Sequence, residues 1–369
     1  MKNLMLTLAL FAGLALALAG CSDSPVTPAA DNSAEKSIDS ALDRHENRHN
    51  QGIVVVANRA SGSISVINAR TAELIETIGL PMNDGDATPE PMYVNQVRHC
   101  RRFFVGDRAN NRVVALSSRT FEVVGTVAAG QGVFHMWASD RGDQLWVNND
   151  IDNTITVIDP YSLDVLATVT VPADLVAMGG KPHDVILDHR SRYAFVTVLG
   201  VAGPNDYLVQ FETDGFTEMN RAAVGKDPHV SLGRHTYLYV PCQNSDQVLV
   251  FNPESLELVD EIIVPGAHGA AMAGNGKRFY TTNLPGGGAG ALYTIETRSN
   301  EVVGLPVDTP YAVPHNLALT PNGRMMYVTH SGGTSDKVTV YRLVGRDRMP
   351  QYVGEISVGL NPFGIGYVD

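Results

Sequence analysis

A repeated unit of roughly 40 to 50 residues limits most strongly what this chain can fold into. Each unit contains short runs of Val, Ile and aromatic residues, separated by turns rich in Gly, Asn, Asp and Pro. Such alternating runs between turn residues predict strands, and four runs in a unit predict a four-stranded sheet. One unit shows the pattern well, with expected strands at 228–233, 237–242, 247–252 and 257–264.

The number of units predicts how the sheets are arranged. Three strands near the N-terminus lack a first strand, six complete units follow, and the final residues 361–368 again look like a first strand. A ring that closes by pairing its last strand with its first sheet satisfies this pattern and leaves only short edges exposed. The sequence therefore predicts an all-β, seven-bladed β-propeller of four-stranded blades over residues 52–369.

Several second strands carry a recurring motif, seen in Met326-Tyr327-Val328-Thr329, Tyr239-Val240 and Trp146-Val147-Asn148-Asn149. Together with the Pro-His pairs that open the units, this motif resembles the YVTN-type β-propeller repeat proteins. Val198 departs from the pattern because the family has Asn there. The resemblance implies the propeller fold over nearly the whole mature chain, but this fold hosts unrelated activities and does not imply one function.

Histidines recur at the start of the first strand in five units. They are His135, His183, His229, His268 and His315, five of the 11 histidines in the chain. First strands line the central channel of a propeller, so we expect these imidazoles to form an arc at one mouth. Tyr93 and Phe363 are expected to complete the ring of side chains.

The second strand of each unit runs back to the same mouth, which predicts that Cys242 lies beside His229 and His330 beside His315. Imidazole and thiolate are ligands that zinc and copper prefer. The expected ligands are drawn from His135, His183, His229, His268, His315, His330 and Cys242. The site resembles the histidine-lined propeller of nitrous oxide reductase and the periplasmic zinc-chaperone propellers.

Two other interpretations fit the same histidines. Because the Pro-His pair is usual in the YVTN-type repeat, the imidazoles can instead hydrogen-bond the backbone of the adjoining blade. A metal-assisted lyase or lactonase would need a carboxylate near a channel histidine, and Asp107 and Asp184 are the acidic residues at or beside these positions. We expect a binding protein rather than a catalyst, and a scaffold that engages another envelope protein is a further alternative.

The N-terminus predicts export. A basic start, an apolar run and small residues before Cys21 indicate a signal peptide at residues 1–20. Leu18-Ala19-Gly20-Cys21 resembles the lipobox of bacterial lipoproteins, which implies a lipid on Cys21 and anchoring at the outer membrane or cell surface. Residues 21–51 have almost no aromatic or β-branched content, so we expect a disordered tether.

Charge and cysteine content limit the partners. The formal net charge of −12 argues against nucleic-acid binding, which depends on neutralising phosphates. Beyond Cys21, only Cys100 and Cys242 are present, so no disulfide framework is expected. We expect a monomer that reaches the membrane through its lipid.

Overall fold

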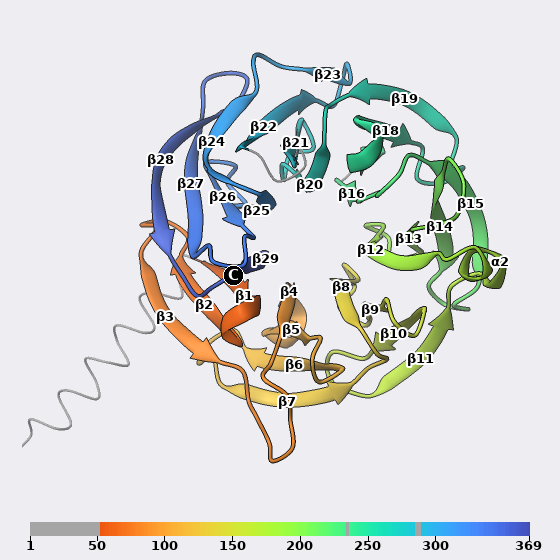
Figure 1. The fold of residues 1–369 in the computed structure, drawn as a ribbon, viewed down its shortest axis with the longest axis vertical. Coiled ribbons are helices and arrows are strands. Elements are labelled where there is room, and N and C mark those ends of the chain that lie inside the picture. Colours follow the sequence, from red (N-terminus) through yellow and green to blue (C-terminus); the bar gives the residue numbers. More distant parts are fainter. Residues whose placement is uncertain (1–51, 234–235, 285–288) are drawn as a thin grey trace, which may run out of the picture. The chain divides into compact units, whose positions relative to one another are not determined.

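The computed structural model describes residues 52–233, 236–284 and 289–369. The predicted signal peptide, lipidated Cys21 and tether lie outside these residues. The described chain forms seven antiparallel sheets, which Figure 1 shows arranged around a common centre with one strand of each sheet innermost. The predicted seven-bladed β-propeller is confirmed.

The blades are numbered from the N-terminus, and the strands of each are given from the channel outward. Blade 1 contains β29 (Pro362–Val368), β1 (Ile53–Asn58), β2 (Ser63–Asn68) and β3 (Leu74–Gly79). Blade 2 contains β4 (Pro91–Val97), β5 (Arg102–Asp107), β6 (Arg112–Ser117) and β7 (Val123–Ala128). Blade 3 contains β8 (Val133–Ala138), β9 (Leu145–Asn149), β10 (Thr154–Ile158) and β11 (Val165–Thr170).

The remaining blades follow the same order. Blade 4 contains β12 (Lys181–Leu187), β13 (Tyr193–Leu199), β14 (Asp206–Glu212) and β15 (Glu218–Val224). Blade 5 contains β16 (Ser231–Leu232), β17 (Leu238–Cys242), β18 (Gln247–Phe251) and β19 (Leu258–Ile263). Blade 6 contains β20 (Ala267–Met272), β21 (Arg278–Asn283), β22 (Ala289–Glu296), β23 (Glu301–Val302) and β24 (Val307–Ala312). Blade 7 contains β25 (Pro314–Leu319), β26 (Met325–His330), β27 (Lys337–Val344) and β28 (Met349–Ser357).

Four short helical segments lie between these strands. They are η1 (Arg59–Ser61), η2 (Arg98–Cys100), η3 (Gln243–Ser245) and α2 (Ala173–Ala177). Within the described residues, no helix is long and apolar enough to cross a membrane.

The ring closes as predicted from the sequence. The last strand, β29, pairs antiparallel with β1, with Val368 opposite Ile53 and Pro362 opposite Asn58. This pairing joins the two ends of the described chain within one sheet, so the first blade also has four strands.

Two blades differ from the predicted pattern. Blade 6 has two outer strands in place of the single one that the four-stranded unit predicts, because β23 and β24 both pair with β22. In blade 5 the first strand is reduced to Ser231–Leu232, and Pro228 makes an isolated bridge to Cys242.

Buried tyrosines of the repeated motif join neighbouring blades. Tyr239 in blade 5 donates a hydrogen bond of 2.7 Å to the side-chain oxygen of Asn300 in blade 6. Tyr327 in blade 7 donates one of 3.1 Å to the carbonyl of Ala69 in blade 1. Both side chains are fully buried. A buried hydroxyl needs a partner, so these bonds explain why the motif has Tyr rather than Phe at these two positions.

The innermost strands of every blade except blade 5 share a bulge near their starts. In blade 4, Pro182 of β12 pairs with Val198 of β13, and the next pair is Val185 with Val196. β12 therefore advances three residues where β13 advances two. The same shift occurs in blade 7 between Pro314 and Leu317. A bulge of this kind redirects side chains, and here it turns two consecutive residues of the first strand toward the channel.

Candidate metal centre

Four histidines form a continuous arc at one mouth of the channel. The ring centroids lie 4.8 Å apart for His183 and His229, 4.0 Å for His229 and His268, and 4.7 Å for His268 and His315. We call these four residues the histidine cluster. They come from blades 4, 5, 6 and 7, and each follows the residue that pairs with the end of its second strand.

The fifth predicted member is displaced by one residue. In blade 3 Val133 pairs with Asn149, so Phe134 occupies the position of the cluster histidines and His135 the next one. The same register places Met92, rather than Tyr93, at that position in blade 2. The prediction for blade 3 was wrong by one residue, because the bulge turns two consecutive side chains to the channel and sequence spacing does not distinguish them. In blade 2 the ring of Tyr93 does lie at the mouth, 5.4 Å from that of Phe134 and 5.6 Å from that of Phe363.

His330 and Cys242 lie where their backbone was predicted, but their side chains turn into the blades. His330 is buried, and its Nδ1 and Nε2 lie 3.0 Å from the Ala312 carbonyl and 2.9 Å from Thr339 Oγ1. Both ring nitrogens are therefore engaged within blades 6 and 7. Cys242 is buried in an apolar cluster and its thiol lies against the Val240 carbonyl. Burial raises the pKa of this thiol to about 12, so it is not a ready thiolate ligand.

Two carboxylates join the histidine cluster. Asp184 follows His183 on the bulge, and its Oδ2 lies 3.3 Å from His229 Nδ1. Asp227 lies immediately before the Pro228-His229 pair and was missed in the sequence analysis. Its φ is 59°, in the left-handed region, where the corresponding residues of blades 3 and 6 are Gly132 and Gly266. Val313 of blade 7 and Asn361 of blade 1 have the same left-handed conformation at this position, so the conformation is a feature of the repeat rather than of Asp227 alone.

Asp206 holds Asp227 in this conformation. Its Oδ2 accepts a 2.8 Å hydrogen bond from the Asp227 backbone N–H, and its Oδ1 lies 2.6 Å from Lys226 Nζ. Lys226 also donates to the Val201 carbonyl at 2.7 Å. Asp206 is almost fully buried, so the loop before His229 is fixed by a charge-assisted network.

The Nδ1 atoms of several channel histidines contact adjoining blades. His229 Nδ1 faces Asp184 in blade 4, and His268 Nδ1 lies 2.7 Å from Gln243 Oε1 in blade 5. His135 Nδ1 accepts the backbone N–H of Val185 at 3.1 Å, and His315 Nδ1 lies 3.4 Å from the Phe363 carbonyl. These contacts agree with the interpretation that histidines link blades, most clearly for His135, whereas His315 Nδ1 lies closer to Asn316 Nδ2 of its own blade, at 2.7 Å.

In two histidines of the cluster, the Nε2 atom is unpaired among the described residues. His183 Nε2 and His229 Nε2 are buried and have no hydrogen-bond partner among the described residues. A ligand atom of His183, one of His229 and a carboxylate oxygen of Asp227 all lie within 4.8 Å of one another. Zinc ligands about 2.0–2.1 Å from the ion lie roughly 3.3 Å apart, so these three atoms would move closer by up to about 1.5 Å to bind one ion.

Burial and charge set the protonation of the cluster. Burial lowers the pKa of His183 to about 3 and that of His315 to about 4, and it holds the pKa of His268 well below the usual value. These imidazoles are therefore neutral at pH 7, which is the form that binds metals.

His229 behaves differently. Burial opposes its protonation, but the charge of the adjacent Asp184 and the hydrogen bond to it raise the pKa of His229. Burial also opposes ionisation of Asp184, yet the imidazoles of His135 and His229 hold its pKa below the ordinary range. Asp107, the other carboxylate that the sequence placed near the channel histidines, forms an ion pair with Arg112, in which Oδ2 lies 2.9 Å from Nε.

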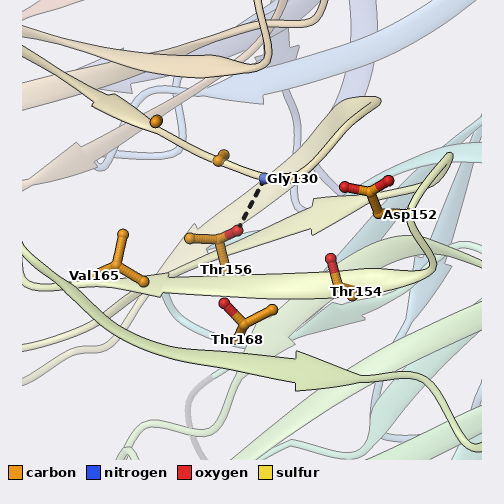
Figure 2. A pocket seen from close by; sticks show the side chains of 8 residues that line it. Gly130, Asp152, Thr154, Thr156, Val165 and Thr168 are labelled. Atoms are coloured by element: carbon orange, nitrogen blue, oxygen red, sulfur yellow. Dashed lines mark hydrogen bonds between the residues drawn. The ribbon is translucent and has the colours of Figure 1, made fainter.

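A separate pocket of about 460 Å³ lies between blades 2 and 3 (Figure 2). Its lining includes Thr154, Thr156, Thr168 and Asp152, and the Gly130 N–H donates to Thr156 Oγ1 at 3.3 Å. The lining has no histidine or cysteine, so it does not compete with the channel as a transition-metal site.

No family model matches the chain. Two curated proteins, both called protein NirF, are similar over part of it. The Pseudomonas aeruginosa protein is 30% identical over 110 residues, 29% of this chain and 26% of that protein. The Stutzerimonas stutzeri protein is 34% identical over 83 residues, 22% of this chain and 21% of that protein. The matched region thus spans about a quarter or less of these relatives.

Solved structures share the fold at low sequence identity. The periplasmic gluconolactonase PpgL of Pseudomonas aeruginosa superimposes with a TM-score of 0.67 at 16% identity, over 86% of this chain and 99% of that one. The dihydro-heme d1 dehydrogenase NirN, in complex with DHE, gives a TM-score of 0.57 at 15% identity, over 85% of this chain and 75% of that one. At these identities the likeness establishes the propeller architecture alone.

Proposed function

We propose that this chain is an exported binding protein that holds a transition metal, zinc or copper, at the histidine mouth of its channel. One observation carries the proposal. Donor atoms of His183, His229 and Asp227 lie within 4.8 Å of one another, and the two buried Nε2 atoms have no hydrogen-bond partner among the described residues. Buried polar atoms are normally paired, and a metal would satisfy both nitrogens together.

The surroundings suit a metal with nitrogen and oxygen ligands. The Asp184 contact directs the Nδ1 proton of His229 away from the site and leaves Nε2 as the donor, the arrangement in which a second carboxylate orients a metal-binding histidine. His268 is the fourth candidate ligand, because its ring lies 4.0 Å from that of His229 and its Nδ1 faces Gln243. Two or three imidazoles with a carboxylate fit zinc or copper.

The location is part of the same proposal. The lipobox-like Leu18-Ala19-Gly20-Cys21 supports lipid anchoring in the cell envelope, and a gluconolactonase with this fold is described as periplasmic. We expect the chain to be a monomer that contacts another protein of the cell envelope. The likeness to YVTN-type repeats and to histidine-lined metal-binding propellers supports the assignment at the level of resemblance.

Element analysis of the purified protein after zinc and copper loading tests the proposal. We expect about one bound ion per chain in the unmutated protein and less than one tenth of that in a His183→Ala, His229→Ala double variant. The matched control is His99→Ala. His99 lies in η2, between the first two strands of blade 2, and its Nε2 contacts the backbone carbonyl of Asp140. Absence of bound metal in the unmutated protein would refute the proposal.

A second candidate is metal-assisted lactone hydrolysis. The buried pair of His229 and Asp184 at 3.3 Å provides a histidine oriented by a carboxylate, which general acid–base catalysis requires. The gluconolactonase with the same fold suggests the substrate class. Hydrolysis of glucono-lactone that is lost in a His229→Gln variant would support this function, and no turnover by the metal-loaded protein would exclude it.

A further inference from the structure

The part of the mouth opposite the histidine cluster is aromatic. Phe134, Tyr93 and Phe363 come from blades 3, 2 and 1, and the ring of Tyr93 lies 5.4 Å from Phe134 and 5.6 Å from Phe363. The two sectors meet at both ends. Phe134 stacks on His183 at 4.8 Å with an interplanar angle of 28°, and Phe363 lies 4.1 Å from His315.

An arginine covers each outer phenylalanine. Arg59 Cζ lies 5.5 Å from the ring centroid of Phe363, and Arg108 Cζ lies 6.0 Å from that of Phe134. The mouth therefore contains the same series of Arg, Phe and His on each side of Tyr93. One series is Arg59, Phe363 and His315, and the other is Arg108, Phe134 and His183. Arginine over an aromatic face is a favourable contact that also keeps the guanidinium in a fixed place.

The two arginines differ in their hydrogen bonds. Arg108 is 2.8 Å from Asp150 and donates to the Gly132 carbonyl at 3.2 Å. The side chain of Arg59 makes no hydrogen bond within the described part of the chain, and its nearest carboxylate, on Glu90, is 3.8 Å away. The Arg59 side chain is 33% exposed, so its donors face solvent at the edge of the aromatic sector.

We propose that this sector binds a small aromatic carboxylate, whose ring packs on Phe363 and whose carboxylate is held by Arg59 at the same channel mouth as the metal. The inference rests on the proposed metal site and names the class of its second ligand. A guanidinium recognises carboxylates with paired N–H groups, and the neighbouring rings provide the apolar surface that an aromatic ligand needs. A bound divalent ion adds positive charge that offsets Glu90, Asp184 and Asp227.

Calorimetric titration of the zinc-loaded protein with three probes tests this proposal. Benzoate carries both features, benzamide lacks the charge, and cyclohexanecarboxylate lacks the planar ring. We expect benzoate to bind more tightly than either analogue, and Arg59→Gln to weaken benzoate binding by about tenfold, as loss of a charge-assisted hydrogen bond does. Phe363→Leu should reduce the preference for benzoate over cyclohexanecarboxylate.

Controls separate this inference from the metal proposal. Arg98→Gln removes an arginine that pairs with Asp369 at 2.8 Å, away from the aromatic sector, and should leave benzoate binding unchanged. Zinc content is measured in every sample, and Arg59→Gln should retain it. Equal benzoate affinity in the Arg59 variant, no benzoate binding, or loss of zinc from that variant would overturn the inference. If the unmutated protein holds no zinc, the metal proposal fails, and Arg59-dependent benzoate binding by the metal-free protein decides the ligand class.

Discussion

The imidazole of His229 and the carboxylate of Asp184 face each other across two blades, with Nδ1 3.3 Å from Oδ2 and both side chains buried. The contact fixes the ring of His229 through Nδ1, and its Nε2 has no hydrogen-bond partner among the described residues. Asp184 also accepts the Val230 N–H at 3.4 Å, so one carboxylate orients both the side chain and the backbone at this position.

Replacing Asp184 by Asn should weaken metal binding about 10- to 100-fold, the usual cost of removing the carboxylate behind a metal-binding histidine. The measurement is competition for zinc with a chromophoric chelator. Asp174→Asn is the matched control, because Asp174 is exposed on α2, between blades 3 and 4, and forms an ion pair with Arg221. Unchanged zinc affinity in the Asp184 variant would contradict the assigned role.

Asp206→Asn should loosen Asp227 and lower zinc affinity about tenfold, with a loss of about 1–3 kcal/mol in the free energy of unfolding. The control is Asp246→Asn in blade 5, where Asp246 accepts the Gly266 N–H at 2.8 Å in the same geometry. Gly266 has no side chain to bind the ion and leads only into His268, the fourth candidate ligand, so this variant should lose stability but less zinc affinity than the Asp206 variant. Denaturant unfolding and zinc competition on both variants separate the two effects.

Acid should destabilise the metal-free protein. The pKa values of His183 and His315 are about 3 and about 4 in the folded state, below the ordinary 6.5, so the unfolded chain takes up protons first. Their contribution is present above about pH 6.5 and is lost as the pH falls toward these values. Each of the two imidazoles should lower the free energy of unfolding by about 2 kcal/mol when the pH falls from 6.5 to 5.

The raised pKa of His229 acts in the opposite sense. Its contribution is present at low pH and is lost as the pH rises through the folded value, so it offsets part of the acid effect. Urea unfolding at pH 7 and pH 5 measures the net change. A His183→Asn, His315→Asn double variant should show a smaller loss between these pH values, and an equal loss would count against the burial of these rings as its cause.

His135 should behave as a structural residue. Its Nδ1 accepts the Val185 N–H from the next blade, so His135→Ala leaves a partly buried donor unpaired and should cost about 1–3 kcal/mol in the free energy of unfolding. Zinc content should stay at the unmutated level. Loss of zinc in a folded His135→Ala protein would place this residue among the ligands and contradict the register found here.

The ring of seven blades could be predicted from sequence because alternation of apolar residues and the repeat length both specify it. The position of the cluster histidines followed from the same repeat. The register at Phe134 and His135 could not, since a bulge directs two neighbouring side chains to the channel. Asp227 was missed because its backbone conformation and its contact with Asp206 exist only in the folded loop.

The directions of Cys242 and His330 also depended on three-dimensional structure. Their strand positions were predicted correctly, but the side chain of a strand residue faces one side of its sheet, and these two face the blade interior. Backbone proximity to His229 and His315 therefore did not bring them into the cluster.

Anomalous diffraction from crystals of the zinc-loaded protein, recorded on both sides of the zinc edge, tests the metal site most directly. The account predicts one strong peak about 2 Å from the Nε2 atoms of His183 and His229, with Asp227 as a further ligand. A peak elsewhere on the protein, or fully loaded crystals with no peak at the histidine cluster, would contradict it.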